Sequence, residues 1–256
     1  MNLFDLTGKT AVIIGGNSTL GGSMAEALGG HGADVAVVGR NMEKCEQVVA
    51  RIQALGGGKA KSFSADATNA DDLRRVLAEV LDWTGRVDVL MNCPGKNSAT
   101  PFFDITMEEW DSIMDVNLKG VVLACQVFGK HMVDKGEGGS IINISSVSSE
   151  PPLSKVFTYS ASKAAVNNLT KNLAREFAPS RVRVNAIIPG FFPAEQNRKI
   201  LSPERIASIM GHTPMNRFGE AHELQGAAVY LASEKASGFV TGSLLRVDGG
   251  FGAMTI

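Results

Sequence analysis

The chain has 256 residues, of which 44% are hydrophobic and 20% charged, and its formal net charge is −1. Length and composition fit one large α/β domain spanning residues 1–256. A net charge near zero provides no basic field that would attract nucleic acid or an anionic membrane, so neither is an expected partner.

The cysteines and the N-terminus bear on the compartment. Cys45, Cys93 and Cys125 are odd in number and widely spaced, which argues against a disulfide framework or a zinc site. The four histidines also lack the spacing of a metal site. The N-terminal stretch has no secretory signal, and no apolar run approaches the ~20 residues that span a bilayer. We therefore expect a cytoplasmic protein without a bound metal.

Short β-branched runs alternate with helix-length segments along the whole chain. Helices are predicted at 42–55 and 70–83, where apolar residues stand three and four apart. Several runs are almost continuously apolar, which indicates strands buried on both faces of a parallel sheet. The pattern predicts a doubly wound α/β fold. The predicted strands are 10–16, 34–39, 60–66, 87–93, 140–146, 181–190 and 243–250.

The stretch VIIGGNSTLGG, residues 12–22, predicts a strand, a glycine-rich turn and a helix. Its spacing differs from the common G-x-G-x-x-G fingerprint, with Thr19 where a phosphate loop more often carries glycine. On this stretch alone, a turn without a ligand remains an alternative to a dinucleotide site. Four glycines would let the backbone bend and approach a pyrophosphate at the helix N-terminus: Gly15, Gly16, Gly21 and Gly22.

The second predicted strand ends at Gly39 and Arg40, about 20 residues after the glycine turn. Sites for NAD carry an acidic residue here, which accepts the 2′-hydroxyl of the adenosine ribose. This chain offers instead the Arg40 guanidinium, which suits a 2′-phosphate. We predict NADP(H) as the preferred cofactor, with NAD(H) also accepted. The alternative is that Arg40 is a surface residue at the start of a helix.

The stretch YSASK places Tyr159 and Lys163 four residues apart on one face of a predicted helix. A phenol with a pKa near 10 exchanges protons poorly at neutral pH. A lysine ammonium one turn away, together with the positive charge of an oxidised nicotinamide, favours the phenolate and would lower that pKa, as acid–base catalysis requires. Such a pair arises by chance in many helices, so its meaning depends on the surrounding motifs.

Those motifs occur in a specific order. Asn92 to Gly95 (NCPG) end the fourth strand, Asn117 lies in DVNLKG, and Ser146 precedes Tyr159 by thirteen residues. Pro189-Gly190 and VTGSLLRVDGG (240–250) follow. In this order they resemble the short-chain dehydrogenase/reductase family over essentially the whole chain. The resemblance implies a Rossmann-like sheet of about seven parallel strands, a nicotinamide cofactor, hydride transfer between a carbinol and a carbonyl, and a homotetramer.

The resemblance also implies roles for single residues. Tyr159 would be the general acid in reduction and the base in oxidation, and Ser146 would donate a hydrogen bond to the substrate oxygen. Lys163 would bind the nicotinamide ribose and lower the tyrosine pKa. Asn117 would hold a water that relays protons to the lysine.

The cofactor contacts implied by the resemblance lie in the glycine turn and at the strand ends. Asp66 matches a position that contacts the adenine amino group. The implied cofactor set is Gly15, Asn17, Ser18, Thr19, Leu20, Gly21, Arg40, Asn41, Asp66, Ala67, Asn92, Cys93, Pro94, Gly95, Tyr159, Lys163, Pro189, Gly190 and Phe192. The expected substrate set is Ser146, Ser148, Tyr159, Phe191 and Arg198.

Residues 191–220 contain three prolines and do not fit a plain strand–helix unit, so we expect them to cover the substrate. Phe191 and Phe192 would wall the site, and Arg198 in the polar cluster after them would hold a carboxylate. Together with 212–220, this stretch resembles enzymes that interconvert fructuronate and mannonate. The expected substrate is a polar secondary alcohol or ketone such as a sugar acid.

Three alternatives remain open. Arg198 could merely pair with Glu195 on a helix surface. The substrate could be a 3-oxoacyl thioester, whose reduction is a common activity in the family. The protein could also be a nucleotide-binding sensor that does not catalyse a reaction, although Tyr159, Lys163, Ser146 and Asn117 are all retained.

Overall fold

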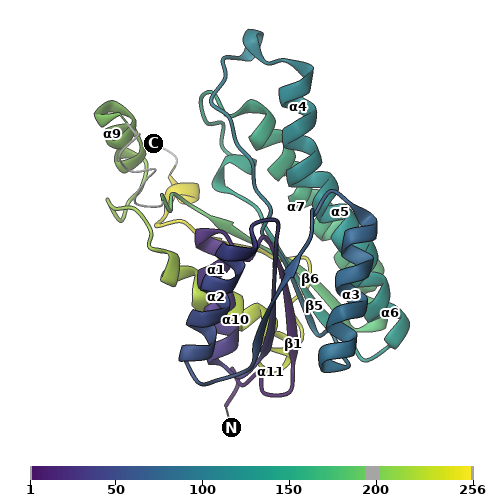
Figure 1. Cartoon of the computed structure of the whole chain (residues 1–256). Coiled ribbons are helices and arrows are strands. Elements are labelled where there is room, and N and C mark those ends of the chain that lie inside the picture. The colour runs from purple at the N-terminus through teal and green to yellow at the C-terminus, as the bar shows by residue number, and fades with distance from the viewer. Residues whose placement is uncertain (1, 194–201, 255–256) are drawn as a thin grey trace.

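The apolar runs of the sequence form the strands of one parallel sheet, as predicted (Figure 1). The computed structural model describes residues 2–193 and 202–254. The sheet has the strand order β3-β2-β1-β4-β5-β6-β7, and every neighbouring pair is parallel. The strands are β1 (Thr10–Ile14), β2 (Asp34–Gly39), β3 (Ala60–Ser64), β4 (Val89–Asn92), β5 (Gly139–Ile144), β6 (Val182–Pro189) and β7 (Leu244–Val247).

Helices cover both faces of this sheet (Figure 1). One layer holds α1 (Thr19–Gly30), α2 (Met42–Ala54) and α10 (Gln225–Ala232), followed by the short α11 (Glu234–Ser237). The opposite layer holds α3 (Ala70–Thr84), α4 (Met107–Met114), α5 (Gly120–Ala124), α6 (Lys130–Lys135) and α7 (Phe157–Phe177). The remaining helix, α9 (Pro203–Gly211), stands apart from both layers at the end of the molecule where α4 begins.

Strand β1 shows why the sheet is buried on both faces. Its side chains alternate, so Ala11 and Ile13 join the core beneath α1 and α2, whereas Val12 and Ile14 join the core beneath α3 and α7. All five β1 residues are buried. A strand covered by helices on both sides has no solvated face, which explains its unbroken apolar sequence.

Helices α4, α5 and α6 run on from one another through two π-helical turns, Asp115–Lys119 and Cys125–Gly129. The resulting helix, Met107–Lys135, is long and apolar enough by length and composition to cross a membrane. In the fold it is a core helix instead, because Val121, Ala124 and Phe128 pack fully buried against the sheet. A π-helical turn shifts the register of side chains, and the first of these turns carries Asn117.

The topology fixes where a ligand can sit. The chain leaves β1 toward β2 and β3 on one side, then returns to β4 on the other side of β1. A crevice opens at such a reversal, outside the carboxyl ends of the strands. The turn after β1 and the segment after β4 meet there, since a Cβ on Gly15 would lie 2.9 Å from the carbonyl oxygen of Cys93.

Candidate active site

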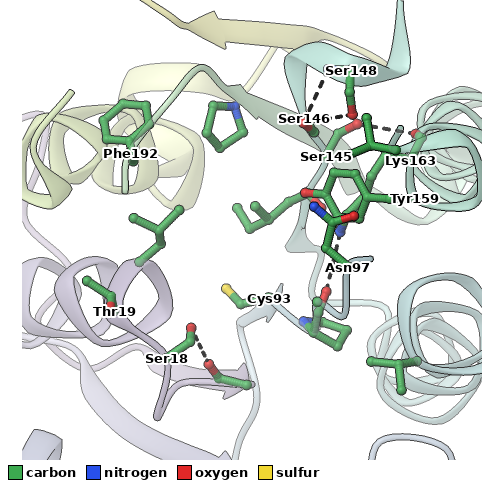
Figure 2. A pocket seen from close by; sticks show the side chains of 18 of the residues that line it. Ser18, Thr19, Cys93, Asn97, Ser145, Ser146, Ser148, Tyr159, Lys163 and Phe192 are labelled. Atoms are coloured by element: carbon green, nitrogen blue, oxygen red, sulfur yellow. Dashed lines mark hydrogen bonds between the residues drawn. The ribbon is translucent and has the colours of Figure 1, made fainter. Parts of the chain in front are cut away.

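A cleft of about 1520 Å³ extends along the carboxyl ends of the strands. Its walls come from the turn after β1, the ends of β2 to β6, the start of α7 and the inner side of α9. Figure 2 shows Ser146, Tyr159 and Lys163 on one side of this pocket, Ser18 and Thr19 on the other, and Cys93 between them. The cleft therefore brings together residues from both halves of the chain.

The glycine turn is shaped by close backbone contacts. Gly15 has φ +75°, and a side chain there would meet the Cys93 carbonyl. At Gly21 the space for a side chain is already filled, because a Cβ would lie 2.6 Å from the Gly15 carbonyl oxygen and 2.8 Å from Ser18 Oγ. Glycine at both positions keeps the backbone and the N-terminus of α1 at the cleft surface.

Ser18, and not Thr19, caps helix α1. Ser18 Oγ accepts a hydrogen bond from the Gly21 amide and donates one to the Gly15 carbonyl. Thr19 is the first helical residue and has no positive φ, which explains why a β-branched residue is tolerated where other loops carry glycine. Its side chain lines the cleft and is not needed for the cap.

The far end of the cleft holds Arg40, directly after β2. Its side chain is 75% exposed and its guanidinium lies 3.9 Å from the Asp66 carboxylate. The pKa of Asp66 is lowered, chiefly by hydrogen bonds from the Thr68 amide and hydroxyl and further by the Arg40 charge. Asn41 caps α2 by accepting from the Lys44 amide. This end can therefore offer a guanidinium to an anionic group and a carboxylate to a hydrogen-bond donor.

Strand β5 ends at Ile144, earlier than the predicted end at residue 146, and this changes the setting of the two serines that follow it. Ser145 is buried and its hydroxyl donates to the Lys163 carbonyl oxygen. Ser146 has extended backbone and caps the short turn Val147–Ser149, accepting from the amide and the hydroxyl of Ser148. Ser145 is buried, whereas Ser146 is partly exposed, so Ser146 is the serine that a ligand in the cleft can reach.

Tyr159 and Lys163 emerge from the first turns of α7, with the lysine Nζ 5.8 Å from the centre of the tyrosine ring. Lys163 is 2% exposed, and its Nζ donates to the carbonyl oxygens of Ile144 (2.9 Å) and Pro94 (3.3 Å). Burial lowers the pKa of Lys163 to about 8. The lysine is therefore held in place by main-chain oxygens at the base of the cleft.

The predicted lowering of the Tyr159 pKa by Lys163 and an oxidised nicotinamide stays a prediction, because burial shifts this pKa the other way in the protein without cofactor. Burial of the phenol raises the pKa of Tyr159, and the hydrogen bond with Ser146 offsets part of that rise. The physical reason is that desolvation penalises the phenolate more than the hydrogen bond with Ser146 favours it. Tyr159 thus remains a protonated phenol at neutral pH, which is the form that can donate a proton.

Three residues assigned to the site from the sequence do not line the cleft: Gly21, Asn92 and Asn117. Asn92 is fully buried in β4, where its amide nitrogen donates to Asn143 across the sheet. Asn117 is also fully buried. Its amide oxygen accepts from the Lys96 amide, and its amide nitrogen donates to the Lys96 carbonyl oxygen and to Ser162 Oγ. The side-chain amide of Asn117 thus holds protein groups, and its expected water-holding role stays a prediction.

The remaining predicted residues within the described ranges do line the cleft, from both the cofactor set and the substrate set. Phe191 and Phe192 do so, and Phe191 also packs on Phe251 with ring centres 5.3 Å apart. Arg198 and its neighbour Glu195 lie outside the described residues, so the two readings of that pair stay untested.

Sequence reasoning missed several polar residues at the cleft wall near Tyr159, namely Asn97, Ser154, Lys155 and Arg205. Asn97 follows the NCPG motif by two residues, and Ser154 and Lys155 stand just before the Tyr159 helix. Proximity to recognised motifs could have signalled these three. Arg205 had no such signal, because only the fold brings α9 to the cleft.

Comparison with known proteins agrees with the arrangement of this site. A family model described as Enoyl-(Acyl carrier protein) reductase matches residues 15–252. An uncharacterized oxidoreductase of Bacillus subtilis, UxuB, is 40% identical, with 96% of each chain aligned. The chain belongs to the short-chain dehydrogenase/reductase family. It is therefore an oxidoreductase of the class that acts on CH–OH and C=O groups.

Two solved structures of this short-chain dehydrogenase/reductase family superpose on the chain almost completely. A gluconate 5-dehydrogenase from Burkholderia cenocepacia, in complex with NADP and tartrate, is 34% identical with a TM-score of 0.92 over 98% of each chain. A protein assigned as a D-mannonate oxidoreductase from Haemophilus influenzae, with bound NAD, is 33% identical with a TM-score of 0.93 over 99% of each chain. Both relatives are named for sugar-acid substrates.

Proposed function

We propose that this protein is an NADP(H)-preferring oxidoreductase that interconverts a secondary alcohol and a ketone on a sugar acid, such as mannonate and fructuronate. One observation carries the proposal: Ser146, Tyr159 and Lys163 meet on one wall of a cleft whose other wall is the glycine turn. A hydride donor held by the turn would face the serine and tyrosine hydroxyls. NAD(H) is also accepted in this proposal.

The residues at the cleft fit a dinucleotide. Gly15 and Ser18 keep the turn and the start of α1 open to a pyrophosphate, whose charge suits a helix N-terminus. Arg40 is exposed at the end where the adenosine ribose would lie, and no carboxylate replaces it at the end of β2. A guanidinium there favours the 2′-phosphate of NADP(H). The B. cenocepacia relative binds NADP and the H. influenzae relative NAD, which supports this preference without excluding NAD(H).

A bound nicotinamide cofactor would supply or accept the hydride, and the chain's own residues would handle the proton. In reduction, Tyr159 would donate its phenolic proton to the substrate oxygen, and in oxidation it would take the proton back. Ser146 would donate a hydrogen bond to the same oxygen, where charge develops. Lys163 would bind the nicotinamide ribose, and its positive charge would make the phenolate less costly.

Asn117 takes a different part in this proposal from the one implied by the family. Its amide fixes the Lys96 backbone and Ser162, and the Ser162 hydroxyl in turn donates to the Tyr159 carbonyl oxygen. We assign Asn117 as a positioning residue that links the segment after β4 to the start of α7.

Polar side chains in the cleft wall support a sugar acid over an acyl chain. Asn97, Ser146, Ser148 and Ser154 line the wall around Tyr159. Ser146, Ser148 and Ser154 already form hydrogen bonds within the protein, but a fatty acyl chain would add no donor or acceptor to their remaining hydrogen-bonding positions. A sugar acid satisfies them with hydroxyls. The reduction of 3-oxoacyl thioesters remains the second candidate because the family model carries an acyl-carrier-protein description.

The surrounding architecture belongs to the same proposal. Residues 1–256 would act as one dinucleotide-binding domain, with residues 191–220 covering the substrate. The described residues of that segment that line the cleft are Phe191, Phe192, Pro193, the α9 N-cap Ser202, and Arg205 and Ile209 on α9. We also propose a homotetramer in the cytoplasm, as expected from the family and from the cysteine pattern.

A substrate screen followed by NADPH and NADH absorbance tests this function. The panel contains D-fructuronate, 5-keto-gluconate, neutral ketoses and an acetoacetyl thioester, with the matching alcohols for the reverse direction. The proposal expects the highest kcat/KM for a sugar acid with NADP(H). Tight NADPH binding without turnover of any carbonyl compound would instead support the sensor hypothesis.

A further inference from the structure

The cleft wall near Tyr159 carries two cations, Arg205 and Lys155. Among the described residues that line the cleft, the cationic side chains are Arg40, Lys155, Lys163 and Arg205, and the only carboxylate is Asp66. Asp66 lies beside Arg40 at the opposite end. Lys163 is buried and bonded to main-chain oxygens. Within the described residues, Arg205 and Lys155 thus face the cleft without an acidic partner.

Helix α9 presents Arg205 toward the cleft. Arg205 and Ile209 stand four residues apart on one face of α9, and both line the cleft together with the N-cap residue Ser202. Ile209 is 4% exposed, which anchors this face against the protein. Arg205 itself is half-buried. The packing of α9 through Ile209 therefore turns the Arg205 side chain toward the cleft.

A neutral contact holds the Arg205 guanidinium. Its Nη1 donates to Ser154 Oγ at 2.7 Å, across the cleft mouth from α9 to the loop before α7. A guanidinium has five N–H donors in a planar fork, so this single bond leaves donors for a ligand. Lys155 follows Ser154 directly and has φ +63°, an uncommon conformation for a residue other than glycine. Lys155 and Ser154, the partner of Arg205, thus both line the same cleft.

We propose that Arg205 and Lys155 form an anion subsite that binds the carboxylate of the substrate while Tyr159 and Ser146 bind its reacting oxygen. The subsite rests on the proposed function for the identity of the substrate, and it narrows that function to anionic sugars. Arginine takes a carboxylate through paired hydrogen bonds, whereas lysine adds a point charge. The subsite consists of described residues only and does not include Arg198.

The test compares Arg205→Gln with Arg205→Lys, Lys155→Gln and a control, Arg74→Gln. Arg74 lies exposed on α3, paired with Asp71 and away from the cleft, so its substitution removes the same charge elsewhere. Each variant is measured with D-fructuronate and with D-fructose, in which a hydroxymethyl group replaces the carboxylate. Binding of the probe D-gluconate to the NADPH-loaded protein is measured by calorimetry, and NADPH affinity is measured separately.

Arg205→Gln should raise the KM for fructuronate and the Kd for gluconate by roughly 10- to 100-fold, the usual scale for a hydrogen bond to a charged group. The kcat, the kinetics with fructose and the NADPH affinity should stay near wild type. Arg205→Lys should fall between, Lys155→Gln should shift the same two constants by less, and Arg74→Gln should shift neither.

Three outcomes would overturn the subsite. Equal losses with fructuronate and fructose would mean that Arg205 only supports the position of α9. A large loss of NADPH affinity would assign the guanidinium to a cofactor phosphate. Unchanged constants would remove Arg205 from binding altogether.

The same measurements separate this inference from the proposed function. Arg205-dependent binding of gluconate without turnover of any sugar acid would leave the subsite standing and remove the function. Turnover of fructuronate with an unchanged KM in Arg205→Gln would do the opposite. A wild-type protein that neither binds gluconate nor reduces fructuronate would contradict both.

Discussion

The ammonium of Lys163 lies 5.8 Å from the centre of the Tyr159 ring and donates to two main-chain carbonyl oxygens at the ends of β4 and β5. Lys163 therefore places a positive charge beside the phenol, while its hydrogen bonds go to main-chain oxygens and not to the phenolic oxygen. The two residues therefore have separate roles: Tyr159 can transfer the proton, and Lys163 supplies a fixed positive charge. The predictions below follow from this division.

Tyr159→Phe should lower turnover by at least ~100-fold, the scale of general acid–base catalysis. The ring and its packing remain, so NADPH affinity should change little. Steady-state kinetics and a fluorescence titration of NADPH measure the two effects. Turnover close to wild type would show that another group donates the proton.

The stability of the cofactor-free protein should depend on pH through Lys163. Its pKa is lowered from 10.5 to about 8 by burial. Between these values the unfolded chain retains a proton that the folded protein has released, so the free energy of unfolding rises with pH in this window. Below pH 8 the cost of the buried charge is fully present, on the order of 3 kcal/mol.

Lys163→Met isolates this effect because it removes the titrating group and leaves all others. The free energy of unfolding of the wild type, relative to Lys163→Met, should increase from pH 8 to pH 10.5 in denaturant titrations. A difference that stays constant over this range would contradict the assignment. The variant should also lose both NADPH affinity and turnover, since the lysine has two proposed roles.

Arg40→Ala should weaken NADPH binding much more than NADH binding, because only NADPH carries a 2′-phosphate. Arg51→Ala is a matched control, since Arg51 pairs with Glu26 and does not line the cleft. Equal losses for the two cofactors in Arg40→Ala would remove the basis for the NADP preference. Gly39→Asp should shift preference toward NADH only if the Asn17 side chain moves, because a Cβ at Gly39 would lie 2.6 Å from its Oδ1.

Two substitutions in the glycine turn should differ sharply. Gly21→Ala places a Cβ against the Gly15 carbonyl and Ser18 Oγ, so it should distort the turn and reduce NADPH affinity at least ~10-fold, as a lost charge-assisted contact would. Thr19→Gly should be tolerated, because the helix cap comes from Ser18. Calorimetric titration with NADPH measures both. Abolished binding in Thr19→Gly would assign a specific phosphate contact to the threonine.

The sheet was predictable from the sequence because each strand is marked by a short run of consecutive, mostly apolar residues. Runs such as residues 10–14 and 182–189 are mostly apolar where two helical layers cover them, and the buried strands match them. The order of motifs likewise predicted the family. Strand ends were less predictable: β5 stops at Ile144, shortly before Ser146 caps the turn Val147–Ser149, which no apolar pattern marks.

The details of the site depended on tertiary contacts that no pattern displays. Asn117 could be recognised by its motif, but its bonds to Lys96 and Ser162 arise only when the segment after β4 packs against α7. The direction of the Tyr159 pKa depends on burial, which a spacing of four residues does not report. Arg205 reaches the cleft through the placement of α9, about 40 residues after the motif that it serves.

The central claim is that the cleft reduces the ketone of a sugar acid with NADPH. The most direct measurement is kcat/KM for D-fructuronate, D-fructose and acetoacetyl thioester, determined side by side with NADPH. We expect fructuronate to be reduced most efficiently, fructose less so, and the thioester least. Faster reduction of the thioester than of any keto-sugar acid would contradict this account and favour a 3-oxoacyl reductase.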